Sequence, residues 1–197
     1  MTDRALGRIG AFSDGVMAVA ITLLVLNIQV PRELHGQKLG DALVDLLPSL
    51  GAFLIAFALV GRFWVIHHNL FEKLRGFDQR LMVLNLGFLA AIVLIPFSSE
   101  LYDTYTKDAI ASAVLGANLS LAAAIHSSMT HHVMRQGLIH EERRAETQPT
   151  VGLSITAAFA LSVPAAFLSV HLAEALWIST VVVRYPLRKL GRRTTSA

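Results

Sequence analysis

The stretch RIGAFSDGVMAVAITLLVLNI, from Arg8 to Ile28, is the feature that most constrains how this chain folds. An apolar helix of about 20 residues is long enough to cross the hydrocarbon core of a bilayer. This stretch nevertheless holds the ionisable Asp14 near its amino-terminal edge and Thr22 among aliphatic residues. A charge inside a membrane costs at least about 3 kcal/mol on insertion scales, so it is normally paired within a bundle or part of a pathway. The stretch therefore predicts a transmembrane helix with a functional role.

Composition supports a membrane protein. Hydrophobic residues make up 54% of the chain and charged residues only 16%, against about 25% charged in soluble domains. The mean hydropathy is +0.55. The chain has no cysteine, which excludes disulfides, thiolate metal sites and cysteine nucleophiles. The first apolar run is longer than the core of a signal peptide and no cleavage pattern follows it, so we expect it to be retained.

Six apolar segments predict an all-α membrane protein with six transmembrane helices in a single domain over residues 1–197. A polar connection with a short helix before Pro48 is expected after the first segment, and Pro164 predicts a kink in the fifth. The sixth segment is short, and an alternative joins it to the fifth as a re-entrant hairpin. The predicted spans cover residues 9–30, 46–67, 81–102, 109–134, 150–170 and 172–186.

The distribution of Lys and Arg predicts the orientation. One side of the six-span arrangement receives three basic residues, Arg32, Lys38 and Lys107. The other side receives thirteen, which are Arg4, Arg8, Lys73, Arg75, Arg80, Arg135, Arg143, Arg144, Arg184, Arg188, Lys189, Arg192 and Arg193. Because cytoplasmic loops carry the excess of Lys and Arg, we expect both termini to be cytoplasmic and the chain to be a multi-pass protein of the inner (plasma) membrane.

Helical spacing sorts the residues of the first segment into two directions. Val19, Thr22, Leu23 and Leu26 recur at three- and four-residue intervals and form one stripe. At about 100° per residue, Asp14 points roughly 140° away from Val19. If the stripe lines a pathway, Asp14 is therefore turned into the packing between helices, and the converse also holds. An aliphatic face of this kind usually packs or faces lipid, and this alternative stays open.

The position of Asp14 relative to the membrane edge favours a structural polar network around it. Other polar side chains fall at comparable distances from the same edge of their predicted spans, and an intramembrane carboxylate needs such hydrogen-bond donors. The alternative is that each of them finds an unrelated local partner. The candidate network partners are Arg62, Trp64, His67, Asn85 and His126.

Two sequence motifs resemble a known family. Arg8 followed by FSDG at Phe12–Gly15 and then by AVAITLLVL is similar to the first-helix signature of the lysosomal potassium channel family called transmembrane protein 175, with its bacterial homologues. The stretch FWVIHHNLF, at Phe63–Phe71, resembles the end of that family's second helix. The resemblance covers the six-helix layout, but only the first-helix motif is highly specific.

The resemblance implies a homotetramer in which the first helix of each subunit lines a central pore. It assigns the constriction to Val19, Leu23 and Leu26, with a hydroxyl layer from Thr22. It also implies a polar network of Arg8, Ser13 and Asp14 within the signature that includes Phe12 and Gly15. Family members more often carry a bulkier Ile or Leu where this chain has Val19, which implies a wider innermost ring or a narrowest point at Leu23 or Leu26.

The implied function is a passive, leak-type potassium channel with modest selectivity. No TVGYG filter is present, so the expected barrier is a hydrophobic constriction at which ions shed part of their water and which closes by dewetting. The only ligands expected are the permeant potassium ions; no cofactor, nucleic-acid partner or enzymatic activity is expected. The alternatives are a proton-coupled or metal-ion secondary transporter using Asp14 or His126, and a non-conducting scaffold.

Metal and catalytic motifs are missing from the sequence. A shared helical ligand face needs two histidines four residues apart, a spacing that the His67–His68 pair does not have. His126, His131 and His132 do not have it either. We therefore expect no metal site. The sequence also contains no zincin motif, nucleophile elbow or Walker A loop.

Overall fold

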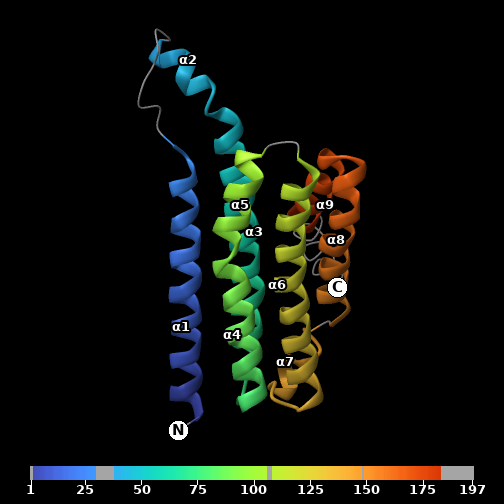
Figure 1. Cartoon of the computed structure of the whole chain (residues 1–197). Coiled ribbons are helices and arrows are strands. Elements are labelled where there is room, and N and C mark those ends of the chain that lie inside the picture. The colour runs from blue at the N-terminus through green and yellow to red at the C-terminus, as the bar shows by residue number, and fades with distance from the viewer. Residues whose placement is uncertain (1, 30–37, 106–107, 148, 183–197) are drawn as a thin grey trace, which may run out of the picture.

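Every regular element that the computed structural model describes is a helix (Figure 1). The described residues are 2–29, 38–105, 108–147 and 149–182. The helices are α1 (Thr2–Leu23), the 3-10 helix η1 (Leu24–Asn27), α2 (Leu39–Val44), α3 (Leu47–Phe71), α4 (Gln79–Val93), α5 (Ile95–Thr104), α6 (Ala109–Arg135), α7 (Glu141–Arg144), α8 (Pro149–Leu168) and α9 (Val170–Val182).

Four helical segments are long and apolar enough to cross a membrane, and they match the first four predicted spans. They are Arg4–Asn27, Leu39–Phe71, Gln79–Thr104 and Ala109–Arg135. The fifth and sixth predicted spans correspond to two shorter apolar helices, Gly152–Leu168 and Val170–Val181. The short helix expected before Pro48 is α2, and α8 continues through Pro164 to Leu168. Residue 30 of the first predicted span and residues 183–186 of the sixth lie outside the described part of the chain.

Two of the predicted spans contain a change of winding or a break that the sequence did not indicate. The first changes from α-helix to 3-10 helix after Leu23 and ends at Asn27. The third is divided at Leu94, where α4 ends and α5 begins. Pro96 lies in the first turn of α5 and explains this break, because proline has no N–H and its ring clashes with the carbonyl four residues earlier.

Aspartates at the N-cap positions stabilise α4 and α6. The Asp78 carboxylate accepts a hydrogen bond from the Leu81 N–H at 2.8 Å, at the start of α4. The Asp108 carboxylate accepts hydrogen bonds from Ile110 N and Ala111 N at 2.7 and 3.1 Å, at the start of α6. Such side chains satisfy backbone donors that lack partners in the first turn.

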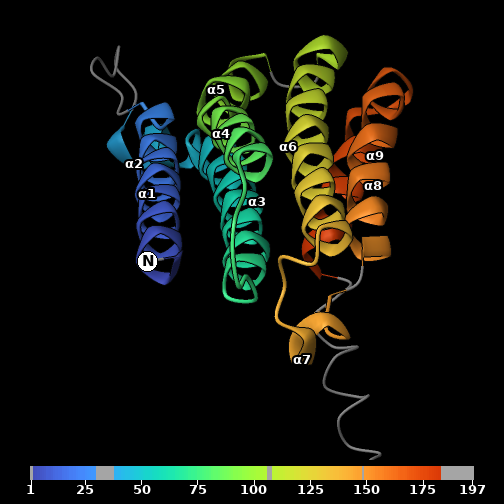
Figure 2. The same cartoon turned by 90° about the horizontal axis from the view of Figure 1, so that it is seen from below.

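The long helices stand side by side, with α1 at one edge of the bundle and α8 with α9 at the other (Figures 1 and 2). α6 lies between these edges and packs against α4, α5, α8 and α9. α1 packs mainly against α3, α4 and α5, and η1 packs against α3 and α5. Among the described residues, one side of α1 is consequently left without a neighbouring helix.

The connections that follow α3 and α6 contact each other at the end of the bundle where the chain begins (Figure 1). Leu74, after α3, forms an antiparallel bridge with Ile139, after α6, and both side chains are buried. Gly137 makes the turn after α6 with a φ of 63°, a conformation that glycine adopts without strain. The connections that precede α4 and follow α6 carry basic residues of the larger predicted group, so the described members of that group gather at one end.

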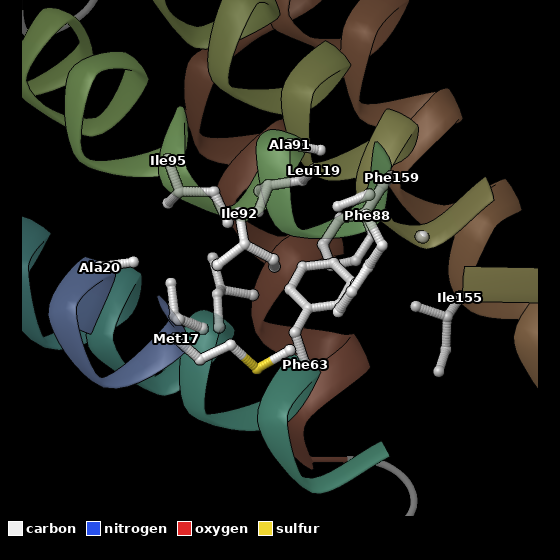
Figure 3. Packing of buried hydrophobic residues seen from close by; sticks show 14 of the residues in the cluster. Met17, Ala20, Phe63, Phe88, Ala91, Ile92, Ile95, Leu119, Ile155 and Phe159 are labelled. Carbon is white, nitrogen blue, oxygen red and sulfur yellow. The ribbon is translucent and has the colours of Figure 1, made fainter. Parts of the chain in front are cut away.

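Aromatic side chains from three helices form the centre of the core (Figure 3). Phe63 of α3, Phe88 of α4 and Phe159 of α8 are each at most 1% exposed. The Phe63 ring lies 6.0 Å from that of Phe88, edge to face, and 5.9 Å from that of Phe159. Met17 of α1 reaches the same cluster, so the packing joins the edge helix to the rest of the bundle.

We expect Asp78→Ala to lower stability by about 1 kcal/mol through loss of the helix cap. The Leu81 N–H and the His132 ring, whose Nε2 lies 2.7 Å from the second carboxylate oxygen, hold the pKa of Asp78 below its ordinary value of 3.8. A depressed pKa contributes stability above the ordinary value, and this contribution is lost as the pH falls through the folded-state pKa. Melting temperatures of both proteins in detergent between pH 7 and 3 should therefore converge as the pH falls. A difference that grows on acidification would contradict this.

Candidate functional site

α1 has one face that is buried in its own subunit. Ser13, Met17, Ala20 and Leu24 recur at three- and four-residue spacing, and each is at most 1% exposed. They pack toward α3, α4 and α5. The spacing places all four on one side of the helix, and this is the side that holds α1 to the bundle.

The opposite face of α1 is exposed and apolar. Val19 is 58% exposed, Leu23 39% and Leu26 69%, although all three are aliphatic. Thr22 is exposed beside them, and its hydroxyl donates to the Val19 carbonyl at 2.8 Å. The four residues of the predicted stripe therefore share one unpartnered face in the isolated subunit. A long aliphatic face of this kind needs lipid or another polypeptide against it.

A chain of buried hydrogen bonds joins α1 to α4 and α3. The Asn85 amide Nδ2 donates to Ser13 Oγ at 2.9 Å, and the Ser13 hydroxyl donates to the Ile9 carbonyl at 2.9 Å. The Asn85 Oδ1 atom lies 2.8 Å from His67 Nε2. Because an amide oxygen only accepts, the His67 proton must lie on Nε2. Each partner in this chain thus has a defined role, and all three side chains are at most 2% exposed.

His67 is held between two aromatic rings. The Phe71 ring stacks on it with centroids 4.2 Å apart, and the Phe88 ring lies nearly parallel to it at 5.2 Å. His126 of α6 is buried next to them, with its ring 5.6 Å from Phe88 and 6.5 Å from His67. Its Nε2 atom has no hydrogen-bond partner within the described part of the chain. The polar network and the aromatic core therefore adjoin each other.

Asp14 faces α3. Its carboxylate accepts a hydrogen bond from the Trp64 indole N–H at 2.9 Å. The Trp64 ring stacks on His68 at 5.3 Å, and His68 Nε2 lies 3.3 Å from the Glu72 carboxylate. Asp14 is half-buried and lies on a different side of α1 from Val19, which agrees with the angle expected from helical spacing.

Arg8, Phe12 and Gly15, which the resemblance placed in the signature, lie apart from these contacts. Arg8 and Phe12 are exposed and line an open groove of about 410 Å³ between α1 and α4, which Met82 and Leu86 also line. Arg8 has no hydrogen-bond or ion-pair partner among the described residues of its own chain. Gly15 is exposed with open space around its Cα, and Arg62 is half-buried on α3. The predicted link of Arg8 to Ser13 and Asp14 is therefore not formed within one subunit.

Sequence reasoning missed Asn27 and its partner. The Asn27 Nδ2 donates to the Pro96 carbonyl at 3.2 Å, which ties the end of η1 to the start of α5. The available signals were a polar residue at the end of an apolar run and a proline inside the third apolar segment. Neither signal shows that the two residues meet.

No group of three or more His, Asp or Glu side chains is placed to hold a metal ion within residues 2–29, 38–105, 108–147 and 149–182. The pairs of His and carboxylate that do occur include His171 of α9, whose Nδ1 lies 3.0 Å from the Glu174 carboxylate; this carboxylate also accepts a hydrogen bond from the Tyr102 hydroxyl. The candidate site is therefore the exposed apolar face of α1 with the polar contacts behind it.

Comparison with known proteins connects this site to a family. The family described as endosomal/lysosomal potassium channel TMEM175 matches residues 8–96, the part that contains most of α1 and its hydrogen-bond partners. A potassium channel of Streptomyces collinus is 36% identical over 141 residues, which cover 70% of this chain and 68% of that protein. A potassium channel of Chamaesiphon minutus is 36% identical over 178 residues, covering 83% and 87%.

A solved structure extends the similarity to the whole fold. The crystal structure of a lysosomal potassium-selective channel TMEM175 homologue from Chamaesiphon minutus superposes with a TM-score of 0.82 at 29% identity. The match covers 94% of this chain and 98% of that one, so it includes the helices beyond the segment that the family description matches.

Proposed function

This chain belongs to the TMEM175 potassium channel family, and from this premise we propose that it forms a potassium-permeable channel with α1 of each subunit lining the pore. Conduction is passive and modestly selective for potassium over sodium. The constriction consists of rings of Val19, Leu23 and Leu26, with Thr22 between them. The chemistry required is ion permeation, which needs no catalytic group or cofactor.

The exposed aliphatic face of α1 is the single observation that carries this proposal. Val19, Leu23 and Leu26 lie on the side opposite Ser13, Met17 and Leu24, which are buried in the subunit. The Asp14 carboxylate of α1 is hydrogen-bonded to Trp64, whereas the aliphatic side of the same helix is exposed. This division supports an assembly in which the free side meets its copies around an axis.

The properties of the ring follow from its side chains. Aliphatic rings present no oxygen to an ion, so a potassium ion must shed part of its water there, and a narrow ring empties of water and closes. The Thr22 hydroxyl proton is committed to the Val19 carbonyl. The lone pairs of its oxygen are therefore left for a cation or water in the pore. Val19 is smaller than leucine, so we place the narrowest point at Leu23 or Leu26.

We further propose a homotetramer in the plasma membrane, with one domain of six spans per chain and both termini cytoplasmic. α8 and α9 serve as the fifth and sixth spans in this arrangement. The described basic residues near the start of α1 and in the connections after α3 and α6 gather at one end of the bundle (Figure 1). This clustering supports the assignment of that end to the cytoplasm.

We expect Leu26→Ala to raise the single-channel conductance and to lower the ratio of potassium to sodium permeability. The variant widens a hydrophobic ring, and a barrier lowered by about 1 kcal/mol raises the rate about fivefold. Planar-bilayer recordings of the purified protein measure both quantities. Leu161→Ala is the matched control, because Leu161 is 60% exposed but lies on α8, at the far edge of the bundle from α1.

The proposal fails if Leu26→Ala and Leu23→Ala both conduct as the unmodified protein does. The subunit number in detergent is an independent check, for which mass photometry or native mass spectrometry is suitable. Four copies with potassium flux in liposomes agree with a shared pore. A monomer that carries no flux would leave only a scaffold role.

The transporter alternative is not favoured, because the relatives are named potassium channels. A transporter would show saturable flux that depends on a second ion, whereas the channel gives a current that rises with voltage without a coupling ion. Asp14 and His126, the residues proposed for such coupling, are engaged by Trp64 and enclosed by the aromatic core, respectively.

A further inference from the structure

Leu26 lies in η1, which is wound more tightly than the α-helix α1 that precedes it. Residues Leu24–Asn27 form the 3-10 helix η1, and the backbone of the following residue, Ile28, is extended with φ −83° and ψ 101°. The Ile28 N–H donates to the Val25 carbonyl at 3.1 Å, three residues back. A 3-10 helix has 3.0 residues per turn and a rise of about 2.0 Å, so its side chains take different directions from those of an α-helix.

This winding changes the direction of Leu26. In an α-helix residues three apart differ by about 60° in direction, whereas in a 3-10 helix they are aligned. Leu26 therefore points the same way as Leu23, and the two side chains are separated by about 6 Å along the axis instead of about 4.5 Å. Both are exposed. The 3-10 turn thus stacks two aliphatic groups in line on the free face.

The same winding aligns Asn27 with Leu24, on the opposite side. Leu24 is 1% exposed and belongs to the core cluster with Met17 and Ala20. Asn27 points toward α5, where its Nδ2 donates to the Pro96 carbonyl at 3.2 Å. Among the described residues, this is the hydrogen bond that connects η1 to another helix.

Pro96, whose carbonyl accepts the hydrogen bond from Asn27, lies in a segment that packs and hydrogen-bonds within the bundle. Pro96 is buried in the first turn of α5, directly after the break at Leu94. Ser98, two residues later, donates to the carbonyls of Leu94 and Ile95 at 3.2 and 3.1 Å and accepts from Asn118 of α6 at 3.1 Å. The start of α5 is therefore tied to the centre of the bundle, and Asn27 holds η1 to it.

We propose that Asn27 is a positioning residue for the constriction: its hydrogen bond to the Pro96 carbonyl holds η1 in the 3-10 conformation that aligns Leu26 with Leu23. This inference rests on the proposed function, since it assumes that the free face of α1 lines the pore. Without the bond, the segment relaxes toward α-helical winding. Leu26 then turns by about 60° away from Leu23, and the outer ring no longer lies over the inner one.

The test replaces Asn27 by Leu, which keeps the branched shape of the side chain and removes the donor. The expected result is a change of about threefold in the potassium-to-sodium permeability ratio. The free energy of an average interhelical hydrogen bond in a membrane corresponds to a shift of this size between two conformations. Bi-ionic reversal potentials in planar bilayers measure this ratio. Gln29→Leu is the matched control, because Gln29 is an exposed amide two residues away, and it should leave the ratio unchanged.

A second measurement reads the direction of Leu26 itself. Since the chain has no cysteine, Leu26→Cys introduces a single thiol, whose reaction rate with a cationic thiol reagent reports access from the pore. Adding Asn27→Leu should change that rate by about threefold on the same free-energy estimate. Asn27→Ala removes the same donor without adding apolar bulk and serves if the Leu variant does not assemble.

The outcomes separate the inference from the function on which it rests. If Leu26→Ala alters the currents and the Asn27 variants do not, the positioning role is overturned and the channel stands. If the Asn27 variants, Leu26→Ala and Leu23→Ala all leave the currents unchanged, the proposed pore falls. If both Asn27 variants fail to form the oligomer that the unmodified protein forms, Asn27 acts in assembly and the positioning role is likewise overturned.

Discussion

Replacing Phe63 with Ala should destabilise the subunit by about 3 kcal/mol, the low end of the usual cost of removing a buried phenylalanine. Phe63 is 1% exposed and packs against Phe88 and Phe159 from two other helices (Figure 3). The transfer term is small in a membrane, because lipid is as apolar as the protein interior. What remains is the cavity and the loss of van der Waals contacts on three helices at once.

Thermal unfolding in detergent, followed by circular dichroism, measures this change. Phe167→Ala is the matched control, because Phe167 is 63% exposed on α8, so its removal leaves no cavity. A cost for Phe63→Ala that is no greater than that for Phe167→Ala would contradict the position of the core. Because Met17 of α1 reaches the same cluster, we also expect the Phe63 variant to conduct abnormally.

Replacing Asn85 with Leu should destabilise the protein by about 2 kcal/mol, since it removes the shared hydrogen-bond partner of two buried groups. The Leu side chain has the same branched shape as Asn but leaves the His67 Nε2–H without an acceptor and Ser13 Oγ without its donor. Individual interhelical hydrogen bonds in membranes average about 0.6 kcal/mol. The larger value is expected here because two buried groups lose their partner together.

Asn69→Leu provides the control for this prediction. The Asn69 amide donates to the Val65 carbonyl of its own helix at 2.6 Å, so its loss breaks no contact between helices. A double-mutant cycle with Ser13→Ala isolates the contact between α1 and α4, because residues that share a hydrogen bond give non-additive effects. Strict additivity of Ser13→Ala and Asn85→Leu would contradict the hydrogen bond.

Part of the candidate site was predictable from residue spacing and depth. The spacing of Val19, Thr22, Leu23 and Leu26 placed them on one face, and they share one exposed face in the structure. The distance of Trp64 from the edge of its predicted span indicated it as a partner for Asp14, and these two residues are hydrogen-bonded. Depth also singled out Asn85, but its partners are Ser13 and His67 instead. The pore-lining role of the stripe stays a prediction.

Other parts were not predictable because they depend on contacts between distant segments. An apolar run longer than about 20 residues indicates a span but not its winding, so the 3-10 turn at Leu24–Asn27 and the break at Leu94 appeared as continuous helix. Arg8 shows the same limit: the resemblance joined it to Ser13 and Asp14, whereas in the subunit it lies exposed at a groove.

The sequence by itself determined the class of this protein and the two directions of α1, because hydrophobic length and helical period are local properties of the chain. Tertiary structure decided which polar groups meet. His67, Asn85 and Ser13 come from three helices, and Asn27 meets Pro96 across 69 residues of chain. Hydrogen bonds of this kind depend on how helices are rotated and shifted against each other, and packing of whole side-chain surfaces sets both.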